Sequence, residues 1–307
     1  MITPAVNADS GAPVSRSLLA PLNDCSPSAL TISYPLRQRL RTAGVLIPVA
    51  ALAVLLLPTA WLGLVLLAVV AVAAWEWTGL AGLNELPARL GFAAVTCLLT
   101  VIGWVFGPPA GFFMLLSMAA IWWVAITPVL FRIRVIEPAT RPDLILLPVG
   151  VGLLGATWAA IIGLHGSAPE GPLLVGFLVV LTGLADTGAY FAGRRFGRRK
   201  LAPVLSPGKT VEGMIGGLAA GTSWGLVLAW LLGLSVGETL LLLALCIVAV
   251  FLSVVGDLYE SLLKRRRGLK DAGSLLPGHG GVLDRIDSMT AAAPVFVLGF
   301  FWLEASL

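Results

Sequence analysis

The sequence predicts an all-α, polytopic integral membrane protein with about nine transmembrane helices and a polar cavity that faces the cytoplasm. Three observations lead to this prediction: the composition, the lengths of the apolar segments, and the placement of the basic residues. Of the 307 residues, 58% are hydrophobic and only 12% are charged. The mean hydropathy of +0.96 lies outside the range of soluble domains.

Apolar segments of spanning length recur along the chain. A helix needs roughly 20 mostly apolar residues to cross a hydrocarbon core of about 30 Å. Segments near this length, separated by Pro, Gly or charged residues, are expected over 42–57, 60–79, 90–106, 111–131, 144–164, 172–192, 212–233, 238–260 and 288–304. The first two are expected to form a hairpin around LLLPTAW.

The basic residues give an orientation. If the N-terminus is cytoplasmic and the spans alternate, all 20 Lys and Arg residues fall in cytoplasmic segments, whereas outer loops such as LHGSAPEGP contain none. Cytoplasmic loops of membrane proteins carry an excess of Lys and Arg. The sequence therefore predicts a multi-pass protein of the plasma (inner) membrane with a cytoplasmic N-terminus.

The remaining composition excludes several classes. A pI of about 9.3 and a net charge of +4 reflect the basic cytoplasmic loops, so no nucleic-acid partner is expected. Cys25, Cys97 and Cys246 match no metal-ligand spacing. Residues 1–35 are rich in Ser, Pro, Ala and Asn and are expected to form a disordered cytoplasmic extension. Residues 36–183 would form the N-terminal transmembrane helices, and residues 184–307 a C-terminal catalytic region.

The run EGMIGGLAAG places Gly213, Gly217 and Gly221 four residues apart. This is the small-residue pattern of closely packed membrane helices, for which we expect a structural role. Such faces permit a homodimer but do not require one.

Charge is concentrated in two predicted cytoplasmic loops, of which the first contains SPGKT, Ser206 to Thr210. A Walker-type phosphate loop would need Gly at position 203, which is Pro203, and no apolar strand precedes the motif. The SPGKT motif is therefore expected to be a turn that leads into a helix. With Lys209 beside the helix N-terminus it could bind an anion, or it could be an ordinary capped turn.

The second charged loop runs from Val254 to Ser288. Asp257 lies near the end of one predicted span, and Asp284 and Asp287 would share a face on the first turn of the next. The pair could simply complement the helix dipole. Together with Asp257, however, they form the carboxylate set that a Mg²⁺–polyphosphate site requires, and the nearby cations would take the remaining phosphate charge.

Several other residues near this loop are candidates for a structural role, for substrate binding or for both. Gly280 and Gly281 would let the backbone approach a phosphate, and His279 could donate to phosphate or be incidental. Arg265, Arg266 and Arg267 could fix topology or contact headgroups. Asp186, in LADTGAY, is a candidate metal or supporting residue, whereas Glu76, in AWEWTG, is expected to be structural.

The run SLLKRRRGLKDAGSLLPGHGGVLDRID, residues 261–287, resembles the signature of phosphatidate cytidylyltransferases, also called CDP-diacylglycerol synthases. Ser, Lys-Arg, Lys-Asp, Pro-x-His-Gly-Gly and Asp-Arg-x-Asp all occur at the family's spacing. The segments ADTGAYFAGRRFG and SPGKTVEG and the pair Gly256–Asp257 also look like that family. The resemblance is strong from about Leu184 to Pro294, and before Leu184 it depends on the pattern of spans.

The resemblance implies a nucleotidyltransferase of phospholipid biosynthesis that converts CTP and phosphatidate to CDP-diacylglycerol and pyrophosphate at the bilayer surface. It implies Mg²⁺, with a second cation left open. The implied metal residues are Asp257, Asp284, Asp287 and Asp186, and the catalytic set is Asp257, Asp284, Lys270 and Asp287. Substrate contacts are expected from Ser206, Lys209, Thr210, Lys264, Arg265, His279, Gly280, Gly281 and Arg285.

Two other functions fit parts of the pattern. A CTP-dependent polyprenol or phytol kinase would share a charged cytoplasmic site, but the complete signature argues against it. A transporter would place its acids near the bilayer midplane, often within inverted repeats, and neither feature is evident in this sequence.

Overall fold

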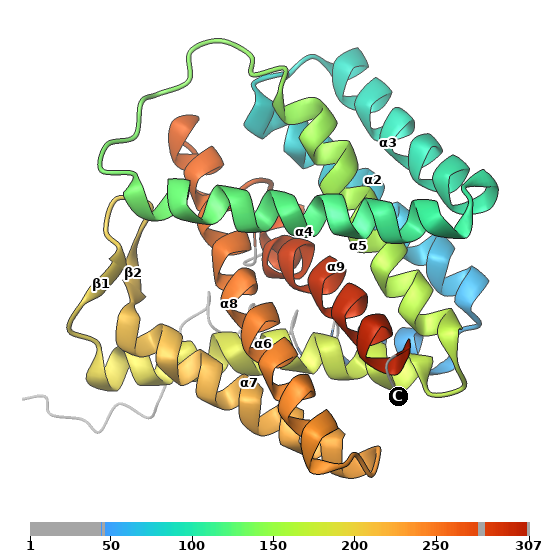
Figure 1. The fold of residues 1–307 in the computed structure, drawn as a ribbon. Coiled ribbons are helices and arrows are strands. Elements are labelled where there is room, and N and C mark those ends of the chain that lie inside the picture. The colour runs from blue at the N-terminus through green and yellow to red at the C-terminus, as the bar shows by residue number, and fades with distance from the viewer. Residues whose placement is uncertain (1–43, 45–46, 276–279, 306–307) are drawn as a thin grey trace, which may run out of the picture.

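The computed structural model describes residue 44 and residues 47–275 and 280–305. The expected N-terminal extension, residues 1–35, and His279 lie outside the described residues. The described chain is almost entirely helical (Figure 1), with one small β-hairpin. The elements are α2 (Thr59–Ala81), α3 (Leu86–Phe106), α4 (Pro109–Arg132), α5 (Leu146–Ser167), α6 (Gly171–Phe196), β1 (Lys200–Ala202), β2 (Ser206–Thr210), α7 (Val211–Leu231), α8 (Val236–Arg266) and α9 (Leu283–Ala305).

The expected number of spans agrees with the described helices. Eight of them, α2 to α9, are long and apolar enough to cross a membrane. A shorter apolar helix, Ile47–Leu56, occupies the described part of the first expected span, 42–57. It is held to α5 by His165, whose Nε2 lies 2.9 Å from the Val54 carbonyl oxygen. The chain is therefore a multi-pass integral membrane protein.

Two helices extend further than their apolar segments predict. Helix α8 continues to Arg266 rather than ending near 260, and α9 begins at Leu283 rather than at 288. The added turn of α8 includes Lys264, whose Nζ lies 3.3 Å from Glu260 Oε1 one helical turn earlier. Hydropathy predicts the part of a helix that lies in hydrocarbon. The residue at which the helix ends depends on ion pairs and caps beyond that part.

Small residues allow α6 and α7 to lie side by side, as expected from the glycine spacing. A Cβ added at Gly217 would stand 2.8 Å from the Ala185 carbonyl oxygen, and one at Gly213 would stand 2.9 Å from that of Ala189. A Cβ added at Gly221 would stand 2.6 Å from the Val250 Cγ2 methyl group of α8. The predicted packing role of these three glycines is confirmed.

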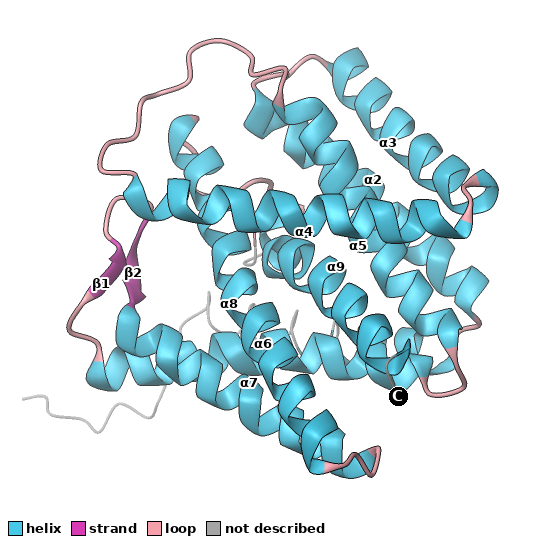
Figure 2. Ribbon diagram, in the orientation of Figure 1, coloured by secondary structure: helices cyan, strands magenta, loops and turns pink. Residues whose placement is uncertain are grey.

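The expected turn at SPGKT is instead the second strand of the antiparallel hairpin β1–β2 (Figure 2). Lys200 pairs with Thr210 and Ala202 with Ser206. The sequence offered no apolar alternation here because the hairpin lies outside the helical bundle and buries little. Thr210 ends the strand and caps α7, since its Oγ1 accepts a hydrogen bond from Gly213 N–H at 3.0 Å.

The loops that carry the basic residues meet at one end of the bundle. Arg267, just after α8, donates from Nε to the Leu80 carbonyl (2.9 Å) and from Nη1 to the Ala139 carbonyl (2.7 Å). Arg266 forms an ion pair with Asp143, ahead of α5, at 3.4 Å. When spans alternate in direction, every second loop lies at the same end of the bundle, so these loops are brought together there. Figure 1 shows the hairpin and the chain between α4 and α5 on the same side of the molecule as the end of α8.

Candidate functional site

Helices α8 and α9 bring the predicted carboxylates together because they cross at a glycine. A Cβ on Gly256 would stand 2.6 Å from the Asp287 carbonyl oxygen and 3.1 Å from Ala291 Cβ. The glycine that precedes Asp257 therefore lets the first turns of α9 pass close to the charged part of α8. This contact explains why a residue without a side chain stands at position 256.

The ammonium group of Lys209 joins strand β2 to this crossing. Its Nζ lies 2.5 Å from Asp257 Oδ2, and both side chains are about one quarter exposed. Ser261 donates its hydroxyl hydrogen to the other oxygen of Asp257 at 3.3 Å. Asp186, an exposed residue of α6, lies in the electrostatic field of Lys209, Asp257 and Arg285. Residues from α6, β2, α8 and α9 thus face one polar region.

Asp284 is buried, with 9% of its surface exposed, and accepts three hydrogen bonds. Lys264 Nζ donates to Oδ1 at 2.6 Å, while Ala272 N–H (2.9 Å) and Gly281 N–H (2.8 Å) donate to Oδ2. Asp284 therefore joins the two described sides of the signature loop to α8. The pairing of Asp284 with Lys264 was not predicted from the sequence, which gave Lys264 only as a candidate substrate contact.

Asp287 lies one turn further along α9, in the field of Asp257, Glu260 and Lys264. Its Oδ1 accepts from Ser288 N–H at 2.6 Å. Glu260 was not singled out from the sequence, although it stands three residues after Asp257 and four before Lys264. It is 3% exposed and forms an ion pair with Lys264 at 3.3 Å, but neither of its carboxylate oxygens has a hydrogen-bond partner among the described residues.

The other predicted substrate residues surround this region less tightly. Lys270, Arg265 and Arg285 are exposed and make no side-chain ion pair within the described part of the chain. Ser206 is half-buried on β2, and the hydroxyl oxygen of Thr210 is used in the α7 cap. Gly280 has a positive φ of 82°, which favours glycine, and places Gly281 N–H on Asp284.

The polar region contains more carboxylates than cations. Its carboxylates are Asp186, Asp257, Glu260, Asp284 and Asp287, and its cations are Lys209, Lys264 and Arg285. This excess of carboxylates, among them Glu260 with only the Lys264 ion pair and no hydrogen bond among the described residues, suits the binding of an added cation. Over residues 44, 47–275 and 280–305, no three His, Cys, Asp or Glu side chains gather closely enough to hold a metal ion by themselves.

Two residues that position the site come from elsewhere. Glu212 accepts from the N–H groups of Arg198 (3.0 Å) and Arg199 (3.1 Å), which fixes the chain before β1. Glu76, which we expected to be structural, is buried on α2 and accepts from Leu283 N–H at 2.7 Å. Sequence spacing alone could not pair these acids with backbone groups in other segments.

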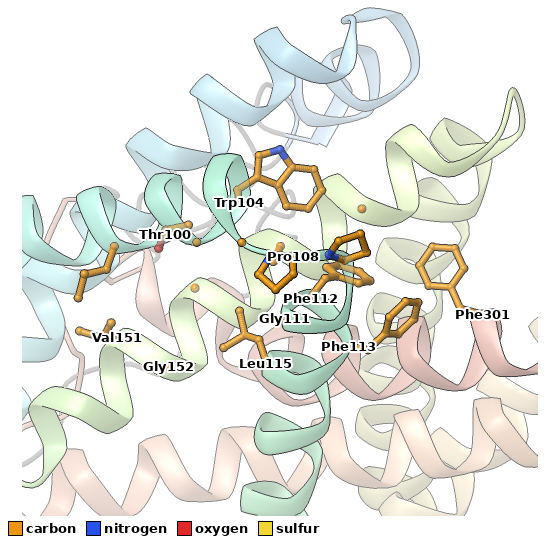
Figure 3. A pocket seen from close by; sticks show the side chains of 17 residues that line it. Thr100, Trp104, Pro108, Gly111, Phe112, Phe113, Leu115, Val151, Gly152 and Phe301 are labelled. Atoms are coloured by element: carbon orange, nitrogen blue, oxygen red, sulfur yellow. The ribbon is translucent and has the colours of Figure 1, made fainter.

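A separate cavity of about 610 Å³ lies between α3, α4, α5 and α9 (Figure 3). Aromatic side chains including Trp104, Phe112 and Phe301 surround it, and none of its lining residues is charged. It includes the α3–α4 turn, Gly107 to Pro109, and so lies away from the basic loops. It has no group capable of the chemistry that the charged cluster offers.

Comparison with known proteins shows the family to which the chain is similar. The Cytidylyltransferase family model matches residues 37–303. A phosphatidate cytidylyltransferase of Pseudomonas aeruginosa is 41% identical over 269 residues, which cover 85% of this chain and 95% of that protein. A phosphatidate cytidylyltransferase of Haemophilus influenzae is 36% identical over 291 residues, covering 87% of this chain and 99% of that protein.

Proposed function

The chain belongs to the cytidylyltransferase family, and we propose that it is a phosphatidate cytidylyltransferase. In the proposed reaction a phosphate oxygen of phosphatidate attacks the α-phosphorus of CTP. The bond from that phosphorus to the bridging oxygen of the β-phosphate breaks, and CDP-diacylglycerol and pyrophosphate form. No protein nucleophile is needed, so catalysis is positioning and charge neutralisation.

The observation that carries the proposal is the convergence of Lys209, Asp257 and Asp284 at one end of a membrane-spanning bundle. One proposed substrate is a soluble nucleotide, and the other is a lipid whose phosphate lies at the membrane surface. A charged site at helix ends is accessible to both. Lys209, Lys264, Lys270, Arg265 and Arg285 are the cations that would bind phosphate oxygens.

The donor set fits Mg²⁺. This ion takes oxygen ligands, keeps several of its waters, and is commonly held by one or two carboxylates together with substrate phosphates. Asp257 and Asp287 would hold it, with Asp186 and Asp284 in support, and a second cation would find further oxygens at Glu260. When bound, Mg²⁺ supplies positive charge that offsets the charge of the reacting phosphates.

Lys209 and Lys264 hold the carboxylates of Asp257 and Asp284 in place before substrate binds. The space beside Gly280 and Gly281 is taken by the carboxylates of Asp284 and Glu76, so these glycines are proposed to shape the signature loop rather than to admit a phosphate. Ser206 and Thr210 are proposed to line the substrate region. His279, outside the described residues, is proposed as a phosphate donor. The charged end is proposed to face the cytoplasm, in the inner membrane, because the basic residues gather there. A homodimer stays a prediction from the small-residue helix faces.

The function is tested with purified protein in detergent micelles, supplied with radiolabelled CTP, phosphatidate and Mg²⁺. Label is expected in the lipid phase only when phosphatidate is present, and EDTA is expected to abolish it. Folded protein that binds CTP but leaves all label in the aqueous phase would contradict the proposal. In that case a polyprenol or phytol acceptor and [γ-³²P]CTP would test the lipid-kinase alternative.

A further inference from the structure

We infer that Glu76, on α2, is a positioning residue that holds the signature loop in its reactive geometry by capping the start of α9. The expected effect on turnover rests on the proposed function, whereas the cap itself is a property of the fold. The inference gives the N-terminal half of the chain a direct part in the site, which the sequence placed wholly in the C-terminal half.

The geometry of the cap is that of a helix N-terminus. Helix α9 starts at Leu283, and the first amides of a helix have no partner within it. Val282 N–H donates to Glu76 Oε1 at 3.1 Å, and Leu283 N–H donates to Glu76 Oε2 at 2.7 Å. The carboxylate comes from a residue 206 positions before Val282 and replaces the local capping side chain that Gly281 and Val282 lack.

The loop is built around this carboxylate. Gly273 and Gly281 lie directly against it, so that a Cβ added at Gly281 would stand 2.5 Å from Glu76 Oε2. A Cβ at Gly273 would also overlap the carboxylate. Glu76 is only 3% exposed, and a buried carboxylate is costly unless donors surround it. Both described sides of the loop therefore depend on Glu76.

The cap is coupled to Asp284 through neighbouring amides. The N–H groups of Gly281, Val282 and Leu283 follow one another along the chain. The first donates to Asp284 Oδ2 at 2.8 Å, and the next two donate to Glu76. If Glu76 no longer accepts both hydrogen bonds, the backbone that orients Asp284 is released. The Lys264–Asp284 pair then loses its fixed position.

Glu76→Gln is the informative variant because Gln keeps the size of the side chain but turns one acceptor into a donor. A donor facing an amide N–H breaks one of the two hydrogen bonds. We expect kcat per folded protein to fall roughly 10- to 100-fold, as for other residues that support a reactive group, with KM for CTP changed less than about threefold. Hydrogen exchange at Val282 and Leu283 is expected to become faster.

Glu85→Gln is the matched control, since Glu85 is exposed and its side chain makes no cap hydrogen bond at the start of α3. It is expected to leave kcat and exchange at residues 282–283 unchanged. If Glu76→Gln does not fold, Glu76→Asp keeps the charge with a shorter reach and is expected to show the same two changes more weakly.

The two readouts separate this inference from the proposed function. Unchanged exchange at Val282 and Leu283 in folded Glu76→Gln would overturn the cap, whatever the enzyme does. Faster exchange with normal kcat would overturn the positioning role. Faster exchange in a protein whose wild type transfers no cytidylyl group would uphold the cap and refute the proposed reaction.

Discussion

The Nζ atom of Lys209 lies 2.5 Å from Oδ2 of Asp257, which joins the β-hairpin to the charged end of helix α8. An ammonium group therefore occupies a carboxylate oxygen that we propose as a metal ligand. The Lys209 ammonium and a Mg²⁺ ion from solution would therefore compete for the Asp257 carboxylate. Lys209 is also proposed to bind a substrate phosphate.

The first prediction is that Lys209→Met strengthens the apparent binding of Mg²⁺ but lowers turnover. The Mg²⁺ concentration for half-maximal rate is expected to fall a few-fold because Asp257 no longer has a competing ammonium. The maximal rate is expected to fall about tenfold or more because a phosphate-binding charge is lost. Initial rates over a Mg²⁺ titration measure both quantities.

Lys200→Met is the matched control, because Lys200 on β1 donates to the Pro207 carbonyl at 2.7 Å and pairs with no carboxylate among the described residues. It is expected to alter neither quantity beyond about twofold. A Lys209→Met enzyme with wild-type rate would remove Lys209 from the site.

The second prediction concerns Asp284, whose carboxylate is expected to contribute both to the stability of the fold and to catalysis. Asp284→Asn is expected to reduce turnover at least about 100-fold. It is also expected to lower stability by roughly 3 kcal/mol, because the ammonium of Lys264, whose side chain is only 12% exposed, loses one of its two carboxylate partners. Thermal unfolding in detergent and the cytidylyl-transfer assay measure the two effects separately.

The double variant Lys264→Met/Asp284→Asn distinguishes the contribution of Asp284 to stability from its contribution to catalysis. Stability is expected to recover only in part, because the double variant removes the ammonium that lost its Asp284 partner but also takes the ion pair with Lys264 from the buried Glu260. Activity is expected to stay lost. Recovery of activity along with stability would mean that Asp284 serves only the fold.

The third prediction uses the helix crossing at Gly256. Gly256→Ala would place a methyl group 2.6 Å from the Asp287 carbonyl oxygen, so α8 and α9 must separate. We expect a stability loss of about 1–3 kcal/mol and a clear loss of activity, since Asp257 and Asp287 move apart.

Gly237→Ala is a control in the same helix, because a Cβ at Gly237 has no atom within 4 Å. It is expected to be neutral or to stabilise by up to about 1 kcal/mol. Equal effects of the two substitutions would show that the crossing does not depend on the absence of a side chain at Gly256.

The fourth prediction tests orientation. In a protein whose native cysteines are replaced by Ser, a single cysteine is introduced by Arg134→Cys, after α4, or by Glu170→Cys, before α6; both positions are exposed. A membrane-impermeant maleimide is expected to label the Glu170→Cys protein in intact cells. The Arg134→Cys protein is expected to react only after lysis. The reverse pattern would place the charged cluster outside the cytoplasm.

Several features of the fold could be predicted because they depend on local composition. Hydrophobic length predicted the eight long helices, and the spacing of Gly213, Gly217 and Gly221 predicted a close-packed helix face but not which helices it would contact. The hairpin β1–β2 was not predicted, since its pairing uses backbone groups and few apolar side chains. Helix ends were misplaced where ion pairs such as Glu260–Lys264 continue a helix beyond its apolar part.

The sequence by itself determined the class of protein, the spans and the identity of the charged side chains, because hydropathy and motif spacing are properties of residues near one another in the chain. Tertiary structure alone decided which of these charges meet. Lys209 reaches Asp257 through a hairpin, and Asp287 approaches α8 because Gly256 has no side chain. Glu76 caps α9 from the opposite half of the chain, a contact set by helix packing over more than 200 positions and by no local pattern.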